Sequence, residues 1–374
     1  MALLFQTPEI LTEIISLSSG GTRAASARVC RLWSKIAIDE IGRRLDSVIP
    51  LLELLAPMRT NRNAEWSFAR RIVKADWEHF ESYAARVKSL QWGNEENFRH
   101  SSGPLSDSVI AQLLLLRPSH ATLLPRLHNI TWSAKSDKSM LQILAFLSNS
   151  ISKFACNLAP GCSSQALSEV FEFIGRGSFS LKEMWLHHPF RISQIDDSLS
   201  NPLEGQTRLS VVAIHRFYGS EKVVSALSGL HTLKKVLIYE GPAPPDDEVI
   251  QWKFNPSCFQ KLEALQFCTL LTDAAKAFET KMPPFLRGIS LTVPPNSPTS
   301  NAHLHRCLTN LAVSCPRLCR LRLELFSARD VTTEQIRFDS LTPLLQCYEL
   351  TDLYVTHNKP IILAEGIVTE IVEA

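Results

Sequence analysis

One pattern of hydrophobic positions recurs along most of the chain. The template is apolar-x-x-apolar-x-apolar, and it occurs ten times between Val87 and Val355. Successive copies start 24 to 40 residues apart, as Leu209 and Leu233 (24) and Val87 and Leu127 (40) illustrate. A recurrence on this length scale indicates an array of structural repeats. The ten copies are Val87-Leu90-Trp92, Leu127-Ile130-Trp132, Ile151-Phe154-Cys156, Leu181-Met184-Leu186, Leu209-Val212-Ile214, Leu233-Val236-Ile238, Leu262-Leu265-Phe267, Leu286-Ile289-Leu291, Leu318-Leu321-Leu323 and Leu350-Leu353-Val355.

Each copy predicts a short strand, and a helix follows it. The last two apolar positions are two residues apart, so in a strand both point to the same face. Runs with helical period lie between the copies, at 140–149, 166–175, 222–230 and 303–313. A strand and a helix cannot bury their apolar faces alone, whereas stacked units bury them jointly. The pattern predicts an α/β repeat solenoid over residues 86–374, with a last helix at 365–374.

The alternate strand positions point away from the buried face, and in such a solenoid they line the concave side, which commonly binds partners. Tyr, Trp and Arg side chains often dominate the binding energy of protein interfaces. We therefore predict a protein-binding patch on these positions. Its residues are Trp185, His187, His215, Leu237, Tyr239, Arg320 and Arg322, with Ala213 between them. Two alternatives stay open: helices or loops cover the patch, or the strand register is one residue off, which would turn it inward.

The first residues carry a different, purely helical pattern. Thr7 suits an N-cap and Pro8 the first turn of a helix. The apolar face of this helix is Ile10, Ile14 and Leu17, with Leu11 and Ile15 beside them. We expect the helix to stop at Gly20-Gly21, because paired glycines carry a high entropic cost inside a helix.

A second N-terminal helix is predicted from Thr22 onward. Its apolar face is Ala25, Val29, Leu32 and Ile36, flanked by Trp33 and Ala37. Residues 41–57 continue in helical register and end at Pro57. The expected organisation is a helical module at 1–48, a helical linker or cap at 49–85 and the solenoid at 86–374. Helices this short bury little alone and need a partner.

Composition and charge exclude several classes of partner. The net charge is +2 and charged residues make up 20% of the chain, so no strong field attracts nucleic acid or an anionic membrane. No apolar run is long enough to span a bilayer, and the N-terminus lacks the basic start of a signal peptide. The nine cysteines are scattered and form no CxxC pair. Reduced thiols in the cytoplasm, the nucleus or both fit this pattern.

Residues 58–80 mix basic and aromatic side chains. The basic ones include Arg59, Arg70 and Lys74, and the aromatic ones include Trp66 and Trp77. Such a mixture could bind nucleic acid. A solvated face with the aromatic rings turned inward is the favoured interpretation, because no nucleic-acid-binding fold surrounds the segment.

The sequence carries no strong catalytic or metal-binding pattern. It contains neither a glycine-rich phosphate loop nor a GxSxG elbow. Asp196-Asp197 and Asp246-Asp247-Glu248 read as solvated loop carboxylates, and His187-His188 lacks a third ligand. We expect no enzyme activity, no cofactor and no metal. The remaining alternative, an active site hidden in the proline-rich loops at 241–247 and 293–300, is the weakest.

The N-terminal residues resemble the F-box family. The matching positions are Pro8-Glu9-Ile10-Leu11, Ile14-Ile15, Val29-Cys30-Arg31 and Trp33. Membership would imply docking on the small Skp-type linker of cullin–RING ubiquitin ligases. Carried over by position, the core and contact residues would be Pro8, Ile10, Leu11, Ile14, Val29, Leu32 and Trp33. Thr7 and Ile15 depart from the family, which usually has Leu and often Phe there. The alternative is a plain helical hairpin that caps the solenoid.

The repeats resemble the irregular leucine-rich repeats that often follow an F-box in fungal proteins. The segment 315–323, CPRLCRLRL, is a close match to that style. At the ninth position of the repeat, where the family places Asn or Cys, only Asn358 conforms, so irregular turns are expected. Together the two resemblances imply a substrate-recognition adaptor of a Skp-cullin-F-box ubiquitin ligase that binds a protein substrate on the solenoid. The alternative is a leucine-rich-repeat interaction scaffold with no link to ubiquitination.

Overall fold

The structure is a computed structural model that describes residues 7–93, 103–118, 122–187, 196–215, 220–239, 259–280, 282–294, 300–325 and 334–362. The helix predicted at 365–374 and the proline-rich loop at 241–247 lie outside these residues. Contacts divide the chain into two compact units, Met1–Leu181 and Lys182–Ala374. These are called the first and the second unit below.

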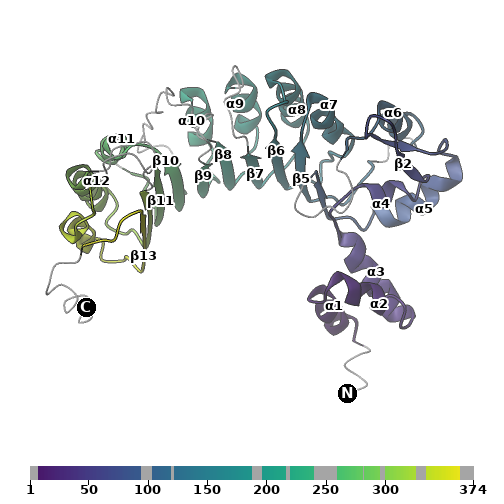
Figure 1. The fold of residues 1–374 in the computed structure, drawn as a ribbon, viewed down its shortest axis with the longest axis horizontal. Helices are drawn as coiled ribbons and strands as arrows, with labels where there is room; N and C mark the ends of the chain where they lie inside the picture. Colours follow the sequence, from purple (N-terminus) through teal and green to yellow (C-terminus); the bar gives the residue numbers. More distant parts are fainter. Residues whose placement is uncertain are drawn as a thin grey trace. The chain divides into compact units, whose positions relative to one another are not determined.

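In the first unit, four parallel strands are hydrogen-bonded in the order β1, β4, β5, β6. Figure 1 labels β5 and β6 of this sheet. A separate antiparallel hairpin joins β2 to β3. The strands are β1 (Arg44–Leu45), β2 (Met58–Thr60), β3 (Trp66–Phe68), β4 (Ser89–Trp92), β5 (Asn129–Ala134) and β6 (Lys153–Leu158). The helices are α1 (Pro8–Ser16), α2 (Gly20–Ser26), α3 (Arg31–Arg43), α4 (Ile49–Leu52), α5 (Lys74–Ala84), α6 (Asp107–Leu115), α7 (Asp137–Leu141), the 3-10 helix η3 (Gln142–Ala145) and α8 (Ser164–Arg176).

In the second unit, seven parallel strands follow one another in sequence order from β7 to β13. They are β7 (Glu183–His187), β8 (Val211–His215), β9 (Lys235–Tyr239), β10 (Ala264–Cys268), β11 (Gly288–Val293), β12 (Arg320–Leu325) and β13 (Asp352–His357). The helices are α9 (Asp196–Glu204), α10 (Glu221–Ser228), α11 (Leu271–Phe278), α12 (Asn301–Ser314) and the 3-10 helices η5 (Phe338–Ser340) and η6 (Thr342–Gln346).

All ten predicted copies of the hydrophobic pattern form strands, and equivalent positions pair with one another. Leu90 is the register partner of Ile130, which is in turn the partner of Phe154. In the second unit the same central position runs through Met184, Val212, Val236, Leu265, Ile289, Leu321 and Leu353. The predicted α/β architecture of parallel strands alternating with helices is therefore confirmed, and it is solenoid-like within each unit.

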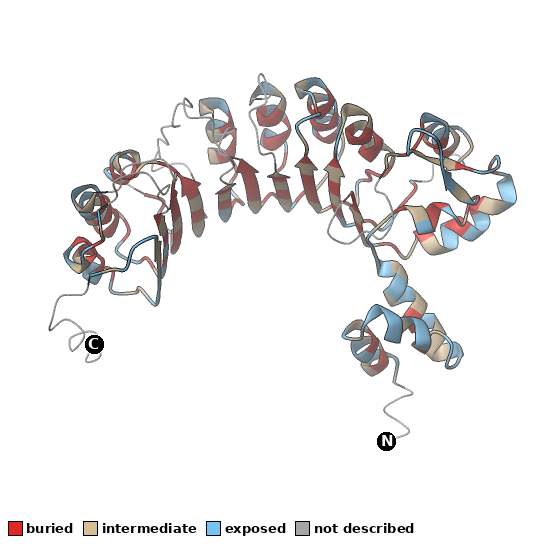
Figure 2. Ribbon diagram, in the orientation of Figure 1, coloured by how far each residue is buried: buried red, intermediate tan, exposed pale blue. Residues whose placement is uncertain are grey.

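From β4 to β12 the apolar strand positions are buried against helices that lie along one face of each sheet, whereas on β13 Leu353 is exposed and Val355 is half-buried (Figure 2). Helix α8 shows how the helix of one repeat covers its strand, because the apolar side chains on its inward face are fully buried. They are Ala166, Leu167, Val170, Phe171 and Ile174. Complete burial of a large aliphatic or aromatic side chain stabilises a fold by about 1.5–3 kcal/mol. One strand and one helix supply only a few such side chains, so neighbouring repeats must share their core.

A backbone contact repeats at the start of the strands. The carbonyl of Lys88 accepts hydrogen bonds from the amides of His128 and Asn129, at 2.9 and 3.0 Å. The carbonyls that accept in the same way from the next repeat are those of His128, Lys182, Ser210, Lys234, Glu263, Arg287 and Cys319. This ladder needs no particular side chain, so adjacent repeats are tied together although an asparagine is missing from most of them.

The N-terminal helices differ from the sequence prediction. Gly20 and Gly21 do not end a helix but begin α2, because the Ser19 side chain accepts a hydrogen bond from the Thr22 amide and caps it. The second predicted helix is in fact two, α2 and α3, with a break at 27–30. The break changes the helical phase, so Ala25 is exposed rather than part of one apolar face. Glycine in a first turn is far less costly than inside a helix.

The segment after α3 was also predicted incorrectly. The continuous helical register expected for 41–57 is interrupted by β1, which pairs with β4, and helix returns only as the short α4. Within 49–85, the β2–β3 hairpin was not predicted. Its two strands have three residues each, too few for a period of two to be recognised.

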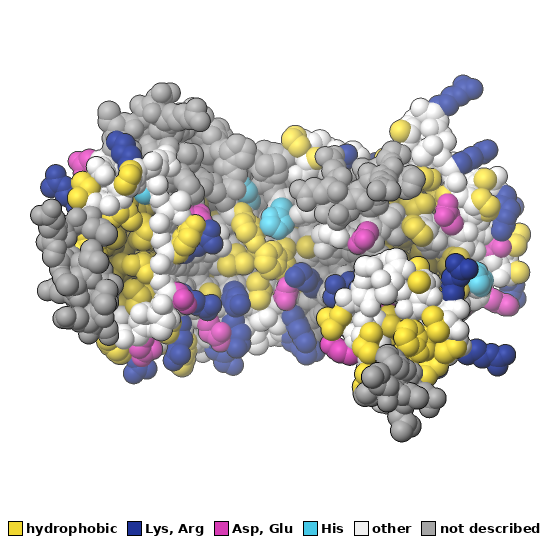
Figure 3. Space-filling view, turned by 60° about the horizontal axis from the view of Figure 1, so that its bottom comes forward, with side chains coloured by type: hydrophobic (Ala, Val, Ile, Leu, Met, Phe, Trp, Pro, Cys, Tyr) yellow, Lys and Arg dark blue, Asp and Glu magenta, His cyan; other side chains and the backbone are white. Residues whose placement is uncertain are grey.

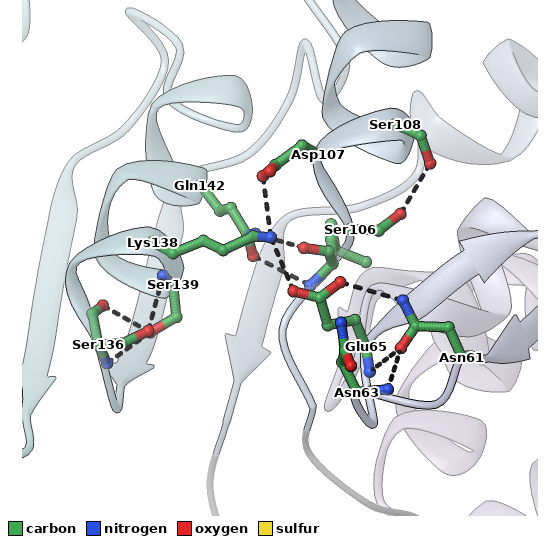
Figure 4. A network of polar contacts seen from close by, with 11 residues as sticks. Asn61, Asn63, Glu65, Ser106, Asp107, Ser108, Ser136, Lys138, Ser139 and Gln142 are labelled. Carbon is green, nitrogen blue, oxygen red and sulfur yellow. Dashed lines mark hydrogen bonds and ion pairs between the residues drawn. The ribbon is translucent and has the colours of Figure 1, made fainter.

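A polar network holds this hairpin to the repeats of the first unit (Figure 4). The Lys138 ammonium lies 2.7 Å from a Glu65 oxygen and 3.0 Å from an Asp107 oxygen. The Gln142 side chain both donates to the Leu105 carbonyl (2.6 Å) and accepts from the Leu105 amide (3.1 Å). The hydrogen bond from Lys138 lowers the pKa of Glu65. The network thus fixes a loop, a hairpin and two helices together by paired polar groups.

Candidate protein-interaction surfaces

Helix α1 has two apolar stripes, and only one of them is used in the fold. Leu11 and Ile15 are 0% and 1% exposed, and they form a small core with Ile36 and Ala37 of α3. The other stripe is Ile10, Ile14 and Leu17, spaced four and three residues apart. Ile14 is 42% exposed and Leu17 is 79% exposed. We call Ile10, Ile14 and Leu17 the outer stripe of α1.

The structure separates the predicted linker-binding residues into two groups. Leu11 belongs to the module core, and Leu32 and Trp33 are half-buried against it. Pro8 is exposed at the first position of α1, and Val29 is 63% exposed in the loop between α2 and α3. Ile14, which is 42% exposed, belongs with them to the accessible group, and Ile10 is half-buried. Leu17 was not among the predicted contacts, although its helical spacing from Ile10 and Ile14 was a signal for it.

On the second unit, the predicted phase of the strands is confirmed. Met184 and Leu186 of β7 are buried, whereas Trp185 and His187 between and beside them are half-exposed. Leu237 and Tyr239 are half-exposed on β9 by the same alternation. Figure 3 shows hydrophobic side chains and a histidine gathered on this open face, with lysine and arginine side chains along a margin. The alternative of a one-residue slip in register is therefore excluded.

Three aromatic side chains of this face form one cluster. The ring centroids of His187 and Tyr239 are 4.6 Å apart, and Trp185 lies 6.2 Å from each of them. The Trp185 indole also donates a hydrogen bond to a Glu183 oxygen at 3.1 Å. Partial burial lowers the pKa of His187 and raises the pKa of Tyr239. We call Trp185, His187, Leu237 and Tyr239 the aromatic face.

The residues of β8 lie beneath this cluster instead of joining it. The prediction that His215 is accessible is wrong, since it is only 3% exposed. His215 is the register partner of Tyr239, and the rings of β7 and β9 meet across β8. Ala213, paired with Trp185 and Leu237, is fully buried for the same reason.

The two predicted arginines lie apart from the aromatic face. Arg320 and Arg322 are exposed on β12, and β10 and β11 separate them from β9. The Arg322 guanidinium bonds a Glu324 oxygen at 2.7 Å and lies 4.8 Å from the Tyr354 ring centroid. These contacts hold Arg322 in one orientation. The sheet therefore presents an aromatic area and a separate charged area, not one continuous patch.

The segment at 58–80 was interpreted from sequence as a solvated basic face with its aromatic rings turned inward. Phe68 and Trp77 are buried, while Arg59, Arg62 and Lys74 are exposed. Phe68 and Trp77 are thus turned into the fold, away from the exposed basic groups, and Trp66 is half-buried.

The part of the chain that the structure describes holds no group of three or more His, Cys, Asp and Glu side chains placed to bind a metal ion. Its eight described cysteines are free thiols, six of them buried. Among the described helices, none combines the length and the apolar composition that crossing a membrane requires. No protein-family model matches the chain, and no curated protein does either.

Proposed function

We propose that this protein is a substrate-recognition adaptor of a cullin–RING ubiquitin ligase. In this proposal α1–α3 are an F-box module that docks on a Skp-type linker, and the strands and helices that follow are irregular leucine-rich repeats that hold a protein substrate. The chain contributes no chemistry of its own. It brings a substrate lysine close to the ligase and so raises its effective concentration.

The observation that carries the proposal is the outer stripe of α1. The module closes its own core with Leu11 and Ile15, yet Ile14 and Leu17 remain exposed. Adjacent exposed apolar side chains on a small module indicate a binding surface. They occur in the segment whose sequence resembles the linker-binding helices of F-box proteins.

The aromatic face of the second unit supports the second half of the proposal. Trp and Tyr supply large contact area at low entropic cost, and rings already packed together lose little freedom on binding. The free cysteines of the described residues fit a reducing location such as the cytoplasm or the nucleus.

The test is a calorimetric titration of the full chain with a Skp-type linker. The wild type is compared with an Ile14→Asp, Leu17→Asp double variant, in which both changes fall on exposed positions and leave the module core intact. The matched control is Leu115→Asp, because Leu115 is 81% exposed on α6 of the same unit. Saturable binding by the wild type and the control, weakened at least about tenfold in the double variant, is the expected result.

Absence of binding by folded wild type would overturn the adaptor proposal. The scaffold function, in which α1–α3 only cap the repeats, would then be the better explanation of the same surfaces.

A further inference from the structure

The helical module carries a second feature that the outer stripe does not explain. An open depression of about 450 Å³ lies between the α2–α3 loop, the first turns of α3 and the end of α5. Its lining includes four cationic side chains, those of Arg28, Arg31, Lys35 and Arg86. No carboxylate is among the described residues that line it.

The charges around this depression repel one another. Arg31 and Lys35 are four residues apart on α3, where like charges are neighbours and unfavourable. Both are near the N-terminal end of the helix, the positive end of its dipole, and the first turn of α3 contains no acidic residue. Arg28, in the loop before the helix, adds a third positive charge.

The acidic groups nearby compensate only one of the four. Arg86 lies 3.3 Å from an Asp39 oxygen and 5.0 Å from the Tyr83 ring centroid, so its charge is partly balanced. For Arg28, Arg31 and Lys35, all exposed, the structure gives no ion pair with any described residue. A bound anion would relieve this repulsion.

We propose that this depression binds an acidic peptide segment of a partner protein. The cations are distributed over a loop, two turns of a helix and a third element, and the depression is open. This arrangement matches several carboxylates spaced along a chain better than one compact anion, which needs donors that converge on a point. Val29, 63% exposed in the same loop, offers an apolar contact beside the charges.

This inference rests on the proposed function, because the acidic peptide segment is assigned to the Skp-type linker that docks on the same helical module. Charges beside an apolar contact chiefly increase the association rate and the selectivity for a complementary partner. The depression would therefore orient an acidic partner before the outer stripe of α1 is buried.

The experiment measures fluorescence anisotropy of a labelled oligoglutamate peptide with the full chain, without the linker. Wild type is compared with an Arg31→Gln, Lys35→Gln double variant. An Arg62→Gln, Lys74→Gln double variant, with one exposed arginine and one exposed lysine changed in the same unit, is the control. We expect binding that weakens with added salt, that the control retains and that the Arg31→Gln, Lys35→Gln variant loses by about tenfold or more.

Cys30 provides a second measurement that needs no variant at the cations. It is exposed and lines the depression, so bound peptide should slow its alkylation. Equal affinity of both double variants, unchanged alkylation of Cys30, or no binding of oligoglutamate by wild type would each overturn the proposal. Because the linker is absent, a failed linker titration and a failed peptide titration remain distinguishable.

Discussion

Trp185 of β7 and Tyr239 of β9 hold their ring centroids 6.2 Å apart across the strand that separates them. Strands two apart in a sheet lie about 9.5 Å from each other, so both rings must lean inward over β8. On β8, Ala213 is the register partner of Trp185, and its small methyl group leaves room for the Trp185 ring, whereas Tyr239 pairs with His215. The aromatic face therefore depends on the small side chain of β8 as well as on the large rings of β7 and β9.

The first prediction concerns this small residue. Ala213→Leu should displace the ring of its register partner Trp185, because position 213 is fully buried and already filled. Overpacking of this kind costs about 1–3 kcal/mol. Urea unfolding followed by circular dichroism measures the loss.

Ala264→Leu is the control for that variant. Ala264 occupies the same face on β10 but is only half-buried, so the added atoms can extend into solvent and the change should stay within about 0.5 kcal/mol. Equal stability of the two variants would contradict the explanation.

The second prediction concerns thiol reactivity. Burial raises the pKa of Cys307 to about 12 and that of Cys315 to about 11, and the thiolate is the reactive form. Raising the pKa of Cys315 from 9.0 to about 11 lowers its thiolate fraction at neutral pH by roughly a hundredfold. Iodoacetamide should therefore modify the exposed Cys30 first, with Cys307 and Cys315 protected until urea unfolds the chain. Peptide mapping by mass spectrometry reads out each site, and rapid modification of Cys307 in folded protein would count against the buried placement.

The strands could be predicted from sequence because their signal is local and repeated. Leu321 and Leu323 have the two-residue spacing of one strand face, and the same spacing recurs ten times in register. A parallel sheet follows, since the helical runs between the copies carry the chain back to the same edge. The accessible residues of the aromatic face follow from the same phase.

The features that could not be predicted from the sequence depend on residues that become neighbours only in the fold or on a choice between two possible caps. His215 is buried beside its register partner Tyr239 on another strand, and nothing in the residues adjacent to His215 in sequence indicates this burial. The start of α2 at Gly20 depends on whether Ser19 or Thr22 provides the cap, and both residue types can do so. The helical spacing of Arg28, Arg31 and Lys35 can be seen in the sequence. Arg86, from the segment after α5, joins these cations only in the folded protein.

The third prediction is a pH dependence at the start of α5. The Arg70 guanidinium bonds both Asp76 oxygens, at 2.7 and 2.9 Å, and the Val73 amide donates to one of them at 2.8 Å. These contacts lower the pKa of Asp76 from 3.8 to about 2. A lowered folded-state pKa stabilises the fold above the unfolded value, and the contribution disappears as pH falls from about 4 to about 2.

Asp76→Asn should therefore be less stable than wild type near neutral pH, with a difference that shrinks to nothing towards pH 2. Urea unfolding at several pH values measures this difference. Glu78→Gln, at an exposed position of the same helix, is the control and should show a much smaller effect. A wild-type advantage over Asp76→Asn that persisted unchanged at pH 2 would contradict the ion pair as its cause.

The fourth prediction concerns Gly93, at the end of β4. Its φ of +79° is a conformation that side chains rarely adopt, and a Cβ there would lie 2.4 Å from the Ser133 carbonyl oxygen of β5. Since that oxygen belongs to the backbone of the neighbouring strand, it cannot move without disturbing the sheet. Gly93→Ala should therefore cost more than about 1 kcal/mol in unfolding free energy.

Gly20→Ala is the matched control, because no atom lies within 4 Å of its added Cβ and Ala is at least as good a helix former. Thermal unfolding of both variants compares them directly, and a Gly93→Ala protein as stable as Gly20→Ala would show that the strand end at Trp92 can relax.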